Sequence, residues 1–291
     1  MRALKVISIL LVITLVLGAC QPTTTPGGAT GKALPQAAAG TRLRQIQDRG
    51  RIIIGVKIDV PLFGYLNPKT NQNEGFDVDM GRAIAEYIFG DATKVEFKEA
   101  VSKNRIPYLQ DDTVDVIIST MTINEERTQQ VDFADCYYVA GQSLLVPKGS
   151  AVRSINDLAG KKVGTVTGST SEKNVRKFAP QAEVLLFDTY SEAVAAMAAG
   201  QADAVTTDDI ILYGFARSEP DKWEVVGGQF TAEPYGIAVK KGTPELLQAV
   251  NDVVRAMKAD GRWKALYEKW VTSPAPALPP ADWHDVKPPL G

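Results

Sequence analysis

Two threonines and an arginine follow a predicted strand, and together they have the chemistry to bind a carboxylate. The segment Ser-Thr-Met-Thr-Ile-Asn-Glu-Glu-Arg places Thr120, Thr122 and Arg127 shortly after the apolar segment 114–118. A guanidinium can donate two parallel hydrogen bonds to a carboxylate, and a threonine hydroxyl can direct a third. The alternative is that Arg127 pairs with one of the two glutamates directly before it on a solvated helix. The residue types alone do not separate these interpretations.

A second polar segment joins a predicted strand, 162–166, to a predicted helix, 171–178. The loop between them begins at Thr167 and ends at Thr170. Free N–H groups at the start of a helix can bind an anion. No Walker lysine follows this loop, which makes a phosphate loop a weak interpretation, and simple helix capping is the competing one.

Asp208 supplies the opposite charge. It comes at the end of a predicted strand that begins at 202. Its carboxylate could hold an ammonium group, and the alternative is an ordinary turn aspartate. An anion site that faces a carboxylate across one cleft matches the two charged ends of an amino acid.

The elements that must position these side chains alternate between strands and helices. Apolar runs predict buried strands, and apolar residues at helical spacing predict helices between them. The expected strands are 52–56, 114–118, 162–166 and 202–206. The expected helices begin near Asp77, Ser171, Ser191 and Thr243, and Gly200 ends the third of them. This alternation predicts an α/β protein with largely parallel sheets.

One order of elements occurs twice and indicates two similar sheets. A helix, a polar turn and a strand containing an aspartate run from 105 to 119, and the same order runs from 191 to 207. Ligands of open α/β sheets bind beyond the carboxyl ends of the strands. A cleft between two lobes would therefore collect these ends from both sheets.

Two apolar segments that end in a basic turn with glycine mark the expected boundaries between the lobes. They are 144–149 and 237–242. If both pass between the lobes, the first lobe consists of 43–146 plus 239–273, and the second lobe consists of 147–238.

The first twenty residues predict export and attachment to lipid. A basic start precedes the apolar run 6–17, and Leu-Gly-Ala then precedes Cys20, as in a bacterial lipobox. The apolar run is shorter than the roughly 20 residues of a membrane-spanning helix. We therefore expect a signal peptide at 1–19, a lipid anchor on Cys20 and a flexible linker at 20–42. The alternative is a secretory peptide, or a short membrane helix, in which the cysteine is incidental.

Composition excludes several classes of function. The chain of 291 residues has a formal net charge of −2, and no basic cluster suggests nucleic acid as a partner. Cys136 would have no partner for a disulfide once Cys20 is modified, and we expect it to be buried. The single histidine, His284, lies in the proline-rich segment 274–291. We therefore expect no zinc site, no cofactor and no histidine-dependent catalysis.

Four motifs resemble the polar amino-acid-binding proteins of ABC importers, the extracellular solute-binding proteins of family 3. They are Gly-Phe-Asp-Val-Asp from Gly75, Asn-Arg-Ile-Pro from Asn104, the segment from Thr120 to Arg127, and Glu-Pro-Tyr-Gly-Ile from Glu233. The similarity covers about 44–271. It implies the two-lobed periplasmic-binding-protein fold (type II) with two crossing strands. It also implies capture of a ligand by cleft closure outside the cytoplasm, at the cell surface or in the periplasm, and delivery to ABC transporter permease subunits.

The resemblance also implies roles for individual residues. Arg127 and Thr122 should hold the α-carboxylate with the backbone N–H of Thr170, and Asp208 should hold the α-amino group. Thr120 and Thr167 belong to the same expected ligand-binding set.

Selectivity for the ligand side chain depends on a different group. Ser102 and Arg105 resemble the segment with which glutamate- and aspartate-binding members hold the side-chain carboxylate, and Lys57 adds a cation. Asp59 would instead favour an amide, unless Lys57 and Asp59 form a solvated pair at the rim. We expect glutamate or aspartate, with glutamine or asparagine as the alternative. A dehydratase-like enzyme on the same fold is a less favoured alternative, because no catalytic acid or base is evident.

Overall fold

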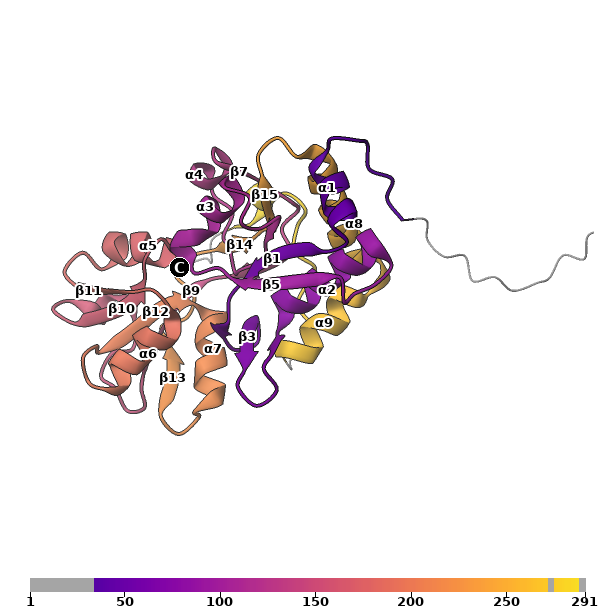
Figure 1. The fold of residues 1–291 in the computed structure, drawn as a ribbon. Helices are drawn as coiled ribbons and strands as arrows, with labels where there is room; N and C mark the ends of the chain where they lie inside the picture. Colours follow the sequence, from indigo (N-terminus) through magenta and orange to yellow (C-terminus); the bar gives the residue numbers. More distant parts are fainter. Residues whose placement is uncertain (1–33, 272–274, 288–291) are drawn as a thin grey trace, which may run out of the picture. The chain divides into compact units, whose positions relative to one another are not determined.

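Two mixed five-stranded sheets with helices packed against them form two lobes (Figure 1). The computed structural model describes residues 34–271 and 275–287. The expected signal peptide and Cys20 lie outside the described residues, and so do the first part of the linker and the ends of the C-terminal segment. Within the described ranges, no helix is long and apolar enough to cross a membrane.

The first lobe contains the sheet with strand order β5-β1-β6-β15-β7. β1 (Ile52–Val56) pairs in parallel with β5 (Val95–Glu99) and β6 (Val116–Ile117). β15 (Ala238–Lys240) then pairs antiparallel with both β6 and β7 (Val131–Phe133). Residues from the last third of the chain therefore complete the sheet that its first half begins.

The second lobe repeats this plan with strand order β11-β10-β12-β9-β13. β10 (Lys162–Val166) pairs in parallel with β11 (Glu183–Phe187) and β12 (Ala204–Asp208). β9 (Gln142–Pro147) lies antiparallel between β12 and β13 (Trp223–Val226). Four strands of each sheet therefore run in one direction, as expected of largely parallel sheets, and one strand, β15 in the first sheet and β9 in the second, runs against them and makes both sheets mixed.

The chain changes sheets at β8 (Tyr138–Ala140) and β14 (Glu233–Tyr235), which pair antiparallel with each other. Figure 1 shows β14 between the two sheets. The segment 144–149 was expected to pass between the lobes. Its first residues instead belong to β9, which pairs with a strand on each side in the second sheet and has buried side chains. Strand pairing therefore places the first change of sheet several residues before the expected boundary at 146.

Helices cover both sheets, and hydrogen bonds from capping side chains determine where a helix such as α6 begins. α6 begins at Tyr190 rather than at Ser191, because the hydroxyl of Thr189 accepts from the N–H of Glu192 and the Glu192 carboxylate binds back to Thr189. The helices around the first sheet are α1 (Arg42–Arg49), α2 (Phe76–Phe89), α3 (Arg105–Gln110), α4 (Glu125–Thr128), α8 (Pro244–Asp260) and α9 (Arg262–Val271). Those of the second lobe are α5 (Thr170–Phe178), α6 (Tyr190–Ala198) and α7 (Asp209–Ser218).

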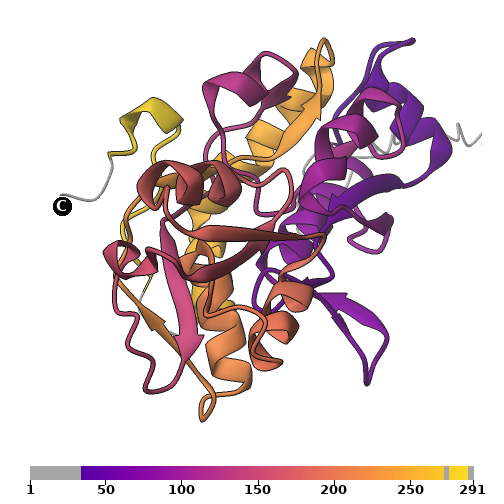
Figure 2. The ribbon, with the colours of Figure 1, turned by 90° about the vertical axis from the view of Figure 1, so that its left-hand side faces the viewer.

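Short elements connect these layers. They are the strands β2 (Asp59–Val60), β3 (Gly64–Asn67) and β4 (Gln72–Glu74), and the 3-10 turns η1 (Ser102–Asn104), η2 (Ile155–Leu158) and η3 (Trp283–Asp285). Figure 2 shows the strands β2 to β4 projecting at the edge of the first lobe. The described part of the C-terminal segment lies on this lobe, where the carbonyl of Ala281 accepts from the N–H of Cys136.

Aromatic rings pack where the chain changes sheets. Phe63 stacks on Phe76 with ring centroids 5.3 Å apart and meets the edge of Tyr138 at 4.9 Å. Tyr235 of β14 stacks on Tyr138 of β8 at 5.7 Å. Such pairs contribute about 0.5–1.5 kcal/mol each beyond their burial, and they tie the crossing strands to the core of the first lobe. Cys136, beside them, is fully buried, as expected.

Gly75 provides a test of this packing. It enters α2 with φ of 130°, a region open essentially to glycine, and an added Cβ would lie 2.2 Å from the carbonyl oxygen of Phe63. We expect Gly75→Ala to lower the free energy of unfolding by about 3 kcal/mol or more. Gly149→Ala is the matched control, because Gly149 also has positive φ but has no neighbour within 4 Å. It should cost about 1–2 kcal/mol. Equal losses for both variants in urea denaturation would contradict the close packing at Gly75.

Candidate functional site

Arg127 is a buried cation at the boundary between the lobes. The N-cap of α4, Asn124, accepts from the N–H of Arg127 at 3.0 Å and fixes the helix that carries it. Arg127 is 8% exposed, and its guanidinium donates to the carbonyl oxygens of Thr122 at 2.6 Å and of Gly168, in the other lobe, at 3.3 Å. Among the described residues it forms no salt bridge with a carboxylate. A buried guanidinium bonded only to neutral groups favours an anionic ligand.

Thr122 and Thr170 face each other from the two lobes. Their hydroxyl oxygens are 3.4 Å apart. Thr170 is the first residue of α5, whose N-cap is Ser169, so that the helix dipole and the first N–H groups point toward the boundary between the lobes. The expected carboxylate-binding residues Arg127, Thr122 and Thr170 are therefore brought together.

Asp208 lies at the end of β12 and is 4% exposed. Its Oδ2 accepts from the hydroxyl of Tyr235 at 2.6 Å, whereas its Oδ1 has no hydrogen-bond partner among the described residues. Burial raises the pKa of this carboxyl well above its usual value, and the charge of Glu233 adds to the effect. An ammonium group would relieve this cost by supplying both a charge and a donor.

Ser102, Arg105 and Lys57 also come together. The Lys57 ammonium nitrogen donates to the hydroxyl of Ser102 at 2.9 Å and is buried. Arg105, also buried, donates to the carbonyl oxygens of Ser119 at 2.9 Å, of Thr120 at 3.1 Å and of Ser102 at 3.2 Å. Burial lowers the pKa of Lys57 to about 7, with the Arg105 charge as the next cause. Lys57 therefore changes its charge near neutral pH.

Asp59 binds backbone N–H groups of the other lobe, whereas it was expected to face a ligand side chain or to pair with Lys57. Its Oδ2 accepts from the backbone N–H groups of Tyr190 at 2.9 Å and of Ser191 at 3.2 Å, at the start of α6 in the other lobe. The alternative of a solvated pair with Lys57 is wrong, because Lys57 is buried and donates to Ser102. Helix N–H groups attract a carboxylate strongly, so Asp59 joins the two lobes.

Thr167 and Thr120, the remaining expected site residues, both use their backbone N–H groups in hydrogen bonds within the protein. Thr167 is half-buried, and its backbone N–H donates to the carbonyl oxygen of Phe187 at 3.0 Å, which leaves that amide occupied. Thr120 is buried in the left-handed region with φ of 43°. Its N–H donates to a carboxylate oxygen of Asp77 at 2.9 Å.

Three further residues of the site were not predicted as such. Asp77 was interpreted only as a helix start. Glu233 is buried and accepts from the Thr170 hydroxyl and from the Asn174 amide, each at 2.9 Å. The ring of Tyr190 lies 5.6 Å from the Lys57 nitrogen. Asp77 and Glu233 belong to two of the motifs that carried the resemblance, and this membership was the available signal.

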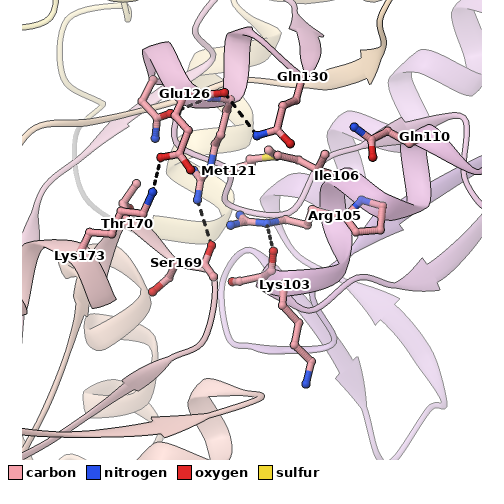
Figure 3. A pocket seen from close by; sticks show the side chains of 15 residues that line it. Lys103, Arg105, Ile106, Gln110, Met121, Glu126, Gln130, Ser169, Thr170 and Lys173 are labelled. Carbon is pink, nitrogen blue, oxygen red and sulfur yellow. Dashed lines mark hydrogen bonds and ion pairs between the residues drawn. The ribbon is translucent and has the colours of Figure 1, made fainter.

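Figure 3 shows a pocket of about 290 Å³ between the lobes. Arg105 and Met121 reach it from the first lobe, and Ser169 and Thr170 reach it from the second. Four cations, Lys103, Arg105, Arg127 and Lys173, line it together with one carboxylate, Glu126, which is paired with Lys173. Within the described ranges, no group of histidine, cysteine and acidic side chains could hold a metal ion.

Comparisons with known proteins agree with this geometry. The model of the bacterial extracellular solute-binding proteins, family 3, matches residues 52–273. The ABC transporter glutamine-binding protein GlnH of Bacillus subtilis is 49% identical over 245 residues, which are 84% of this chain and 89% of the relative. The glutamine-binding protein of Geobacillus stearothermophilus is 45% identical over 84% of this chain and 93% of its own length. The solved structure of an ancestral arginine-binding protein bound to glutamine is 42% identical with a TM-score of 0.73, and the match covers 77% of this chain and 99% of that one.

The two buried charges provide a test of the site. Removing one partner of a buried charge pair costs about 3–5 kcal/mol. We therefore expect Arg127→Ala or Asp208→Asn to weaken amino-acid binding from about a hundredfold to several thousandfold in calorimetric titration. The matched control is Asp209→Asn, because the Asp209 carboxylate already accepts from Gly141 and Gln229. Affinity within about threefold of the parent for both Arg127→Ala and Asp208→Asn would contradict the assignment.

The same Asp208→Asn variant should be more stable than the parent without ligand. The pKa of Asp208 is higher in the folded state than in the unfolded state, where it is close to 4. Above about pH 4 the carboxyl therefore ionises more readily in the unfolded chain, which lowers the stability of the folded state. At pH 7 the neutral amide should therefore raise the free energy of unfolding by about 1 kcal/mol or more. The gain should disappear below about pH 4, where both states keep the proton. A loss of stability at pH 7 in thermal unfolding would argue against a buried carboxylate that lacks a partner.

Proposed function

This chain belongs to the bacterial extracellular solute-binding proteins, family 3, and we propose that it binds glutamine outside the cytoplasm. It is the solute-binding protein of an ABC amino-acid importer, as the motifs indicated. The observation that carries the proposal is the pair Arg127 and Asp208. Both are buried, they have opposite charges, and each has hydrogen-bonding capacity that the described residues leave free. The ends of an amino-acid zwitterion match this pair.

The α-carboxylate is assigned to Arg127, Thr122 and the N–H groups at the start of α5, and the α-amino group to Asp208. The pocket of about 290 Å³ supports the carboxylate end of this assignment, because Arg127 and Thr170 line it, whereas Asp208 is not among its lining residues. Glu233 helps to fix the first residue of α5, because its carboxylate accepts from the hydroxyl of Thr170. Both ends of the ligand would then lose water only when the lobes close over them.

Closure is supported by contacts that join the lobes directly. Lys103 of η1 pairs with Asp188, just before α6, at 2.6 Å. Asp59 accepts from the first N–H groups of the same helix. Figure 1 shows α6 among the elements of the second lobe. A ligand that contacts both lobes adds to these contacts and shifts the population toward the closed form. Permease subunits would recognise that form.

The choice of glutamine over glutamate departs from the preference that the sequence suggested. Two relatives of more than 40% identity are named as glutamine-binding proteins. The surroundings of Arg105 and Lys57 support the same choice. Arg105 donates to three backbone carbonyls, which leaves fewer of its donors for a ligand. Lys57, with a pKa of about 7, has only part of a positive charge at neutral pH. Lys57 therefore attracts a side-chain carboxylate less than its residue type suggests. Both relatives are named as binding proteins, one of them as that of an ABC transporter, which favours binding over catalysis.

Calorimetric titration with glutamine and glutamate tests this choice. At pH 7.5 we expect glutamine to bind about tenfold tighter or more, because a side-chain carboxylate must lose water against a largely neutral Lys57. Below pH 7 Lys57 gains its proton and should attract the carboxylate of glutamate. The affinity ratio of glutamate to glutamine should therefore rise by about tenfold from pH 8 to pH 6. The α-groups are common to both ligands and cancel in the ratio.

Lys57→Met is the control for this pH dependence. The variant should keep glutamine binding, and its glutamate-to-glutamine ratio should change several-fold less between pH 6 and pH 8 than that of the parent. Any remaining change is assigned to Asp77, whose pKa burial also raises to about 7. Tighter binding of glutamate than of glutamine by the parent at pH 7.5 would overturn the choice of ligand. The family assignment would stand in that case.

A lipid anchor on Cys20 is the second part of the proposal. The small residues before Cys20 and the apolar run 6–17 support it. Stable anchoring needs two or more acyl chains. In cells that express the full chain, we expect the parent in the membrane fraction and Cys20→Ala in the soluble extracytoplasmic fraction. Cys136→Ala is the control and should stay with membranes. Unchanged membrane attachment of Cys20→Ala would exclude the anchor.

A further inference from the structure

Thr120 has an unusual backbone conformation at the centre of the binding edge. Its φ is 43°, although a β-branched residue is strongly disfavoured in the left-handed region. It lies between β6 and Thr122 and is buried. The surrounding contacts must therefore hold it in place, and the cost of such a conformation commonly indicates a functional constraint.

Asp77 is the side chain that holds Thr120. This aspartate has no exposed surface, and it lies in the first turn of α2, where the helix dipole favours a negative charge. One carboxylate oxygen accepts from the N–H of Thr120 at 2.9 Å, and the other accepts from the hydroxyl of Tyr137 at 2.7 Å. Both oxygens therefore have a partner, and one partner is the strained amide.

The conformation at Thr120 determines where two cations point. The carbonyl oxygens of Ser119 and Thr120 both accept from the same nitrogen of Arg105, at 2.9 and 3.1 Å. Two residues later, the carbonyl oxygen of Thr122 accepts from Arg127 at 2.6 Å. A rotation of the backbone at Thr120 would turn these carbonyls and release both guanidiniums.

We propose that Asp77 is a positioning residue for ligand binding, which acts by holding Thr120 in its left-handed conformation. The carboxylate does not need to contact the ligand. It sets the direction of the carbonyls in 119–122, and these carbonyls orient Arg105 and Arg127. The effect on glutamine affinity rests on the proposed function, whereas the hold on Thr120 does not.

The first experiment needs no ligand. Hydrogen exchange of the Thr120 amide, followed by NMR in the ligand-free protein, reports the bond to Asp77 directly. Asp77→Ala should speed this exchange by about tenfold or more, and Asp77→Asn, which keeps an acceptor oxygen, should speed it less. Tyr137→Phe is the matched control, because it removes the other hydrogen bond of Asp77 and leaves the Thr120 bond in place. Its Thr120 exchange rate should stay within about threefold of the parent rate.

The second experiment is a double-mutant cycle with glutamine as the probe. Asp77→Ala should weaken binding by about tenfold to a hundredfold. In the Thr120→Gly background the same substitution should have an effect at least threefold smaller, because glycine adopts the left-handed conformation without steric cost. A role in stability alone would give the same loss of affinity in both backgrounds. If Asp77→Ala does not fold, the cycle is measured with Asp77→Asn.

Two results would overturn the proposal. One is an unchanged exchange rate of the Thr120 amide in Asp77→Ala, or in Asp77→Asn if the alanine variant does not fold. The other is an equal effect on affinity in the threonine and glycine backgrounds. If the parent does not bind glutamine, the proposed ligand is wrong and the exchange experiment alone decides whether Asp77 holds Thr120. Failure of both Asp77 variants to fold would assign Asp77 to folding and would also overturn the proposal.

Discussion

Buried charge at the boundary between the lobes is the constraint on which this structure depends. Arg127 donates to carbonyls of both lobes and has no carboxylate partner among the described residues, while Asp208 leaves one oxygen without a hydrogen bond. Burying an ionised group without a partner is expensive in free energy. A zwitterion placed between these residues would compensate both costs at once, which explains how a small ligand can hold two large lobes together.

The fold holds these charged side chains in fixed positions, although each lobe has its own sheet. Each sheet has four strands that run in one direction and one strand that runs against them, and the paired strands β8 and β14 lie where the chain changes sheets. Stacked rings around Tyr138 and Tyr235 fix this crossing to the core of the first lobe. Tyr235 then donates to Asp208, so the same strand that joins the lobes also orients a charge of the site.

Selectivity in such a site depends on how far the protein has already satisfied its own cations. Arg105 donates to three carbonyls, and Lys57 donates to a hydroxyl and loses part of its charge through burial. Residue type alone suggested two strong cations for a side-chain carboxylate. Burial reduces the charge of Lys57 at neutral pH, and Arg105 has fewer donors left for a ligand, which agrees with the glutamine-binding relatives.

The sequence by itself determined the elements whose signal is local. β1 and β10 have the expected bounds, and β1 is the continuous apolar run that a strand buried on both faces requires. The two-lobed fold followed from motifs spread over the chain. Tertiary structure decided the rest: β9 joined the second sheet, Asp59 capped a helix of the opposite lobe, and Asp77 bonded Thr120 from 43 residues away. These outcomes depend on contacts between distant residues, and neither hydrophobic periodicity nor capping preference contains information about such contacts.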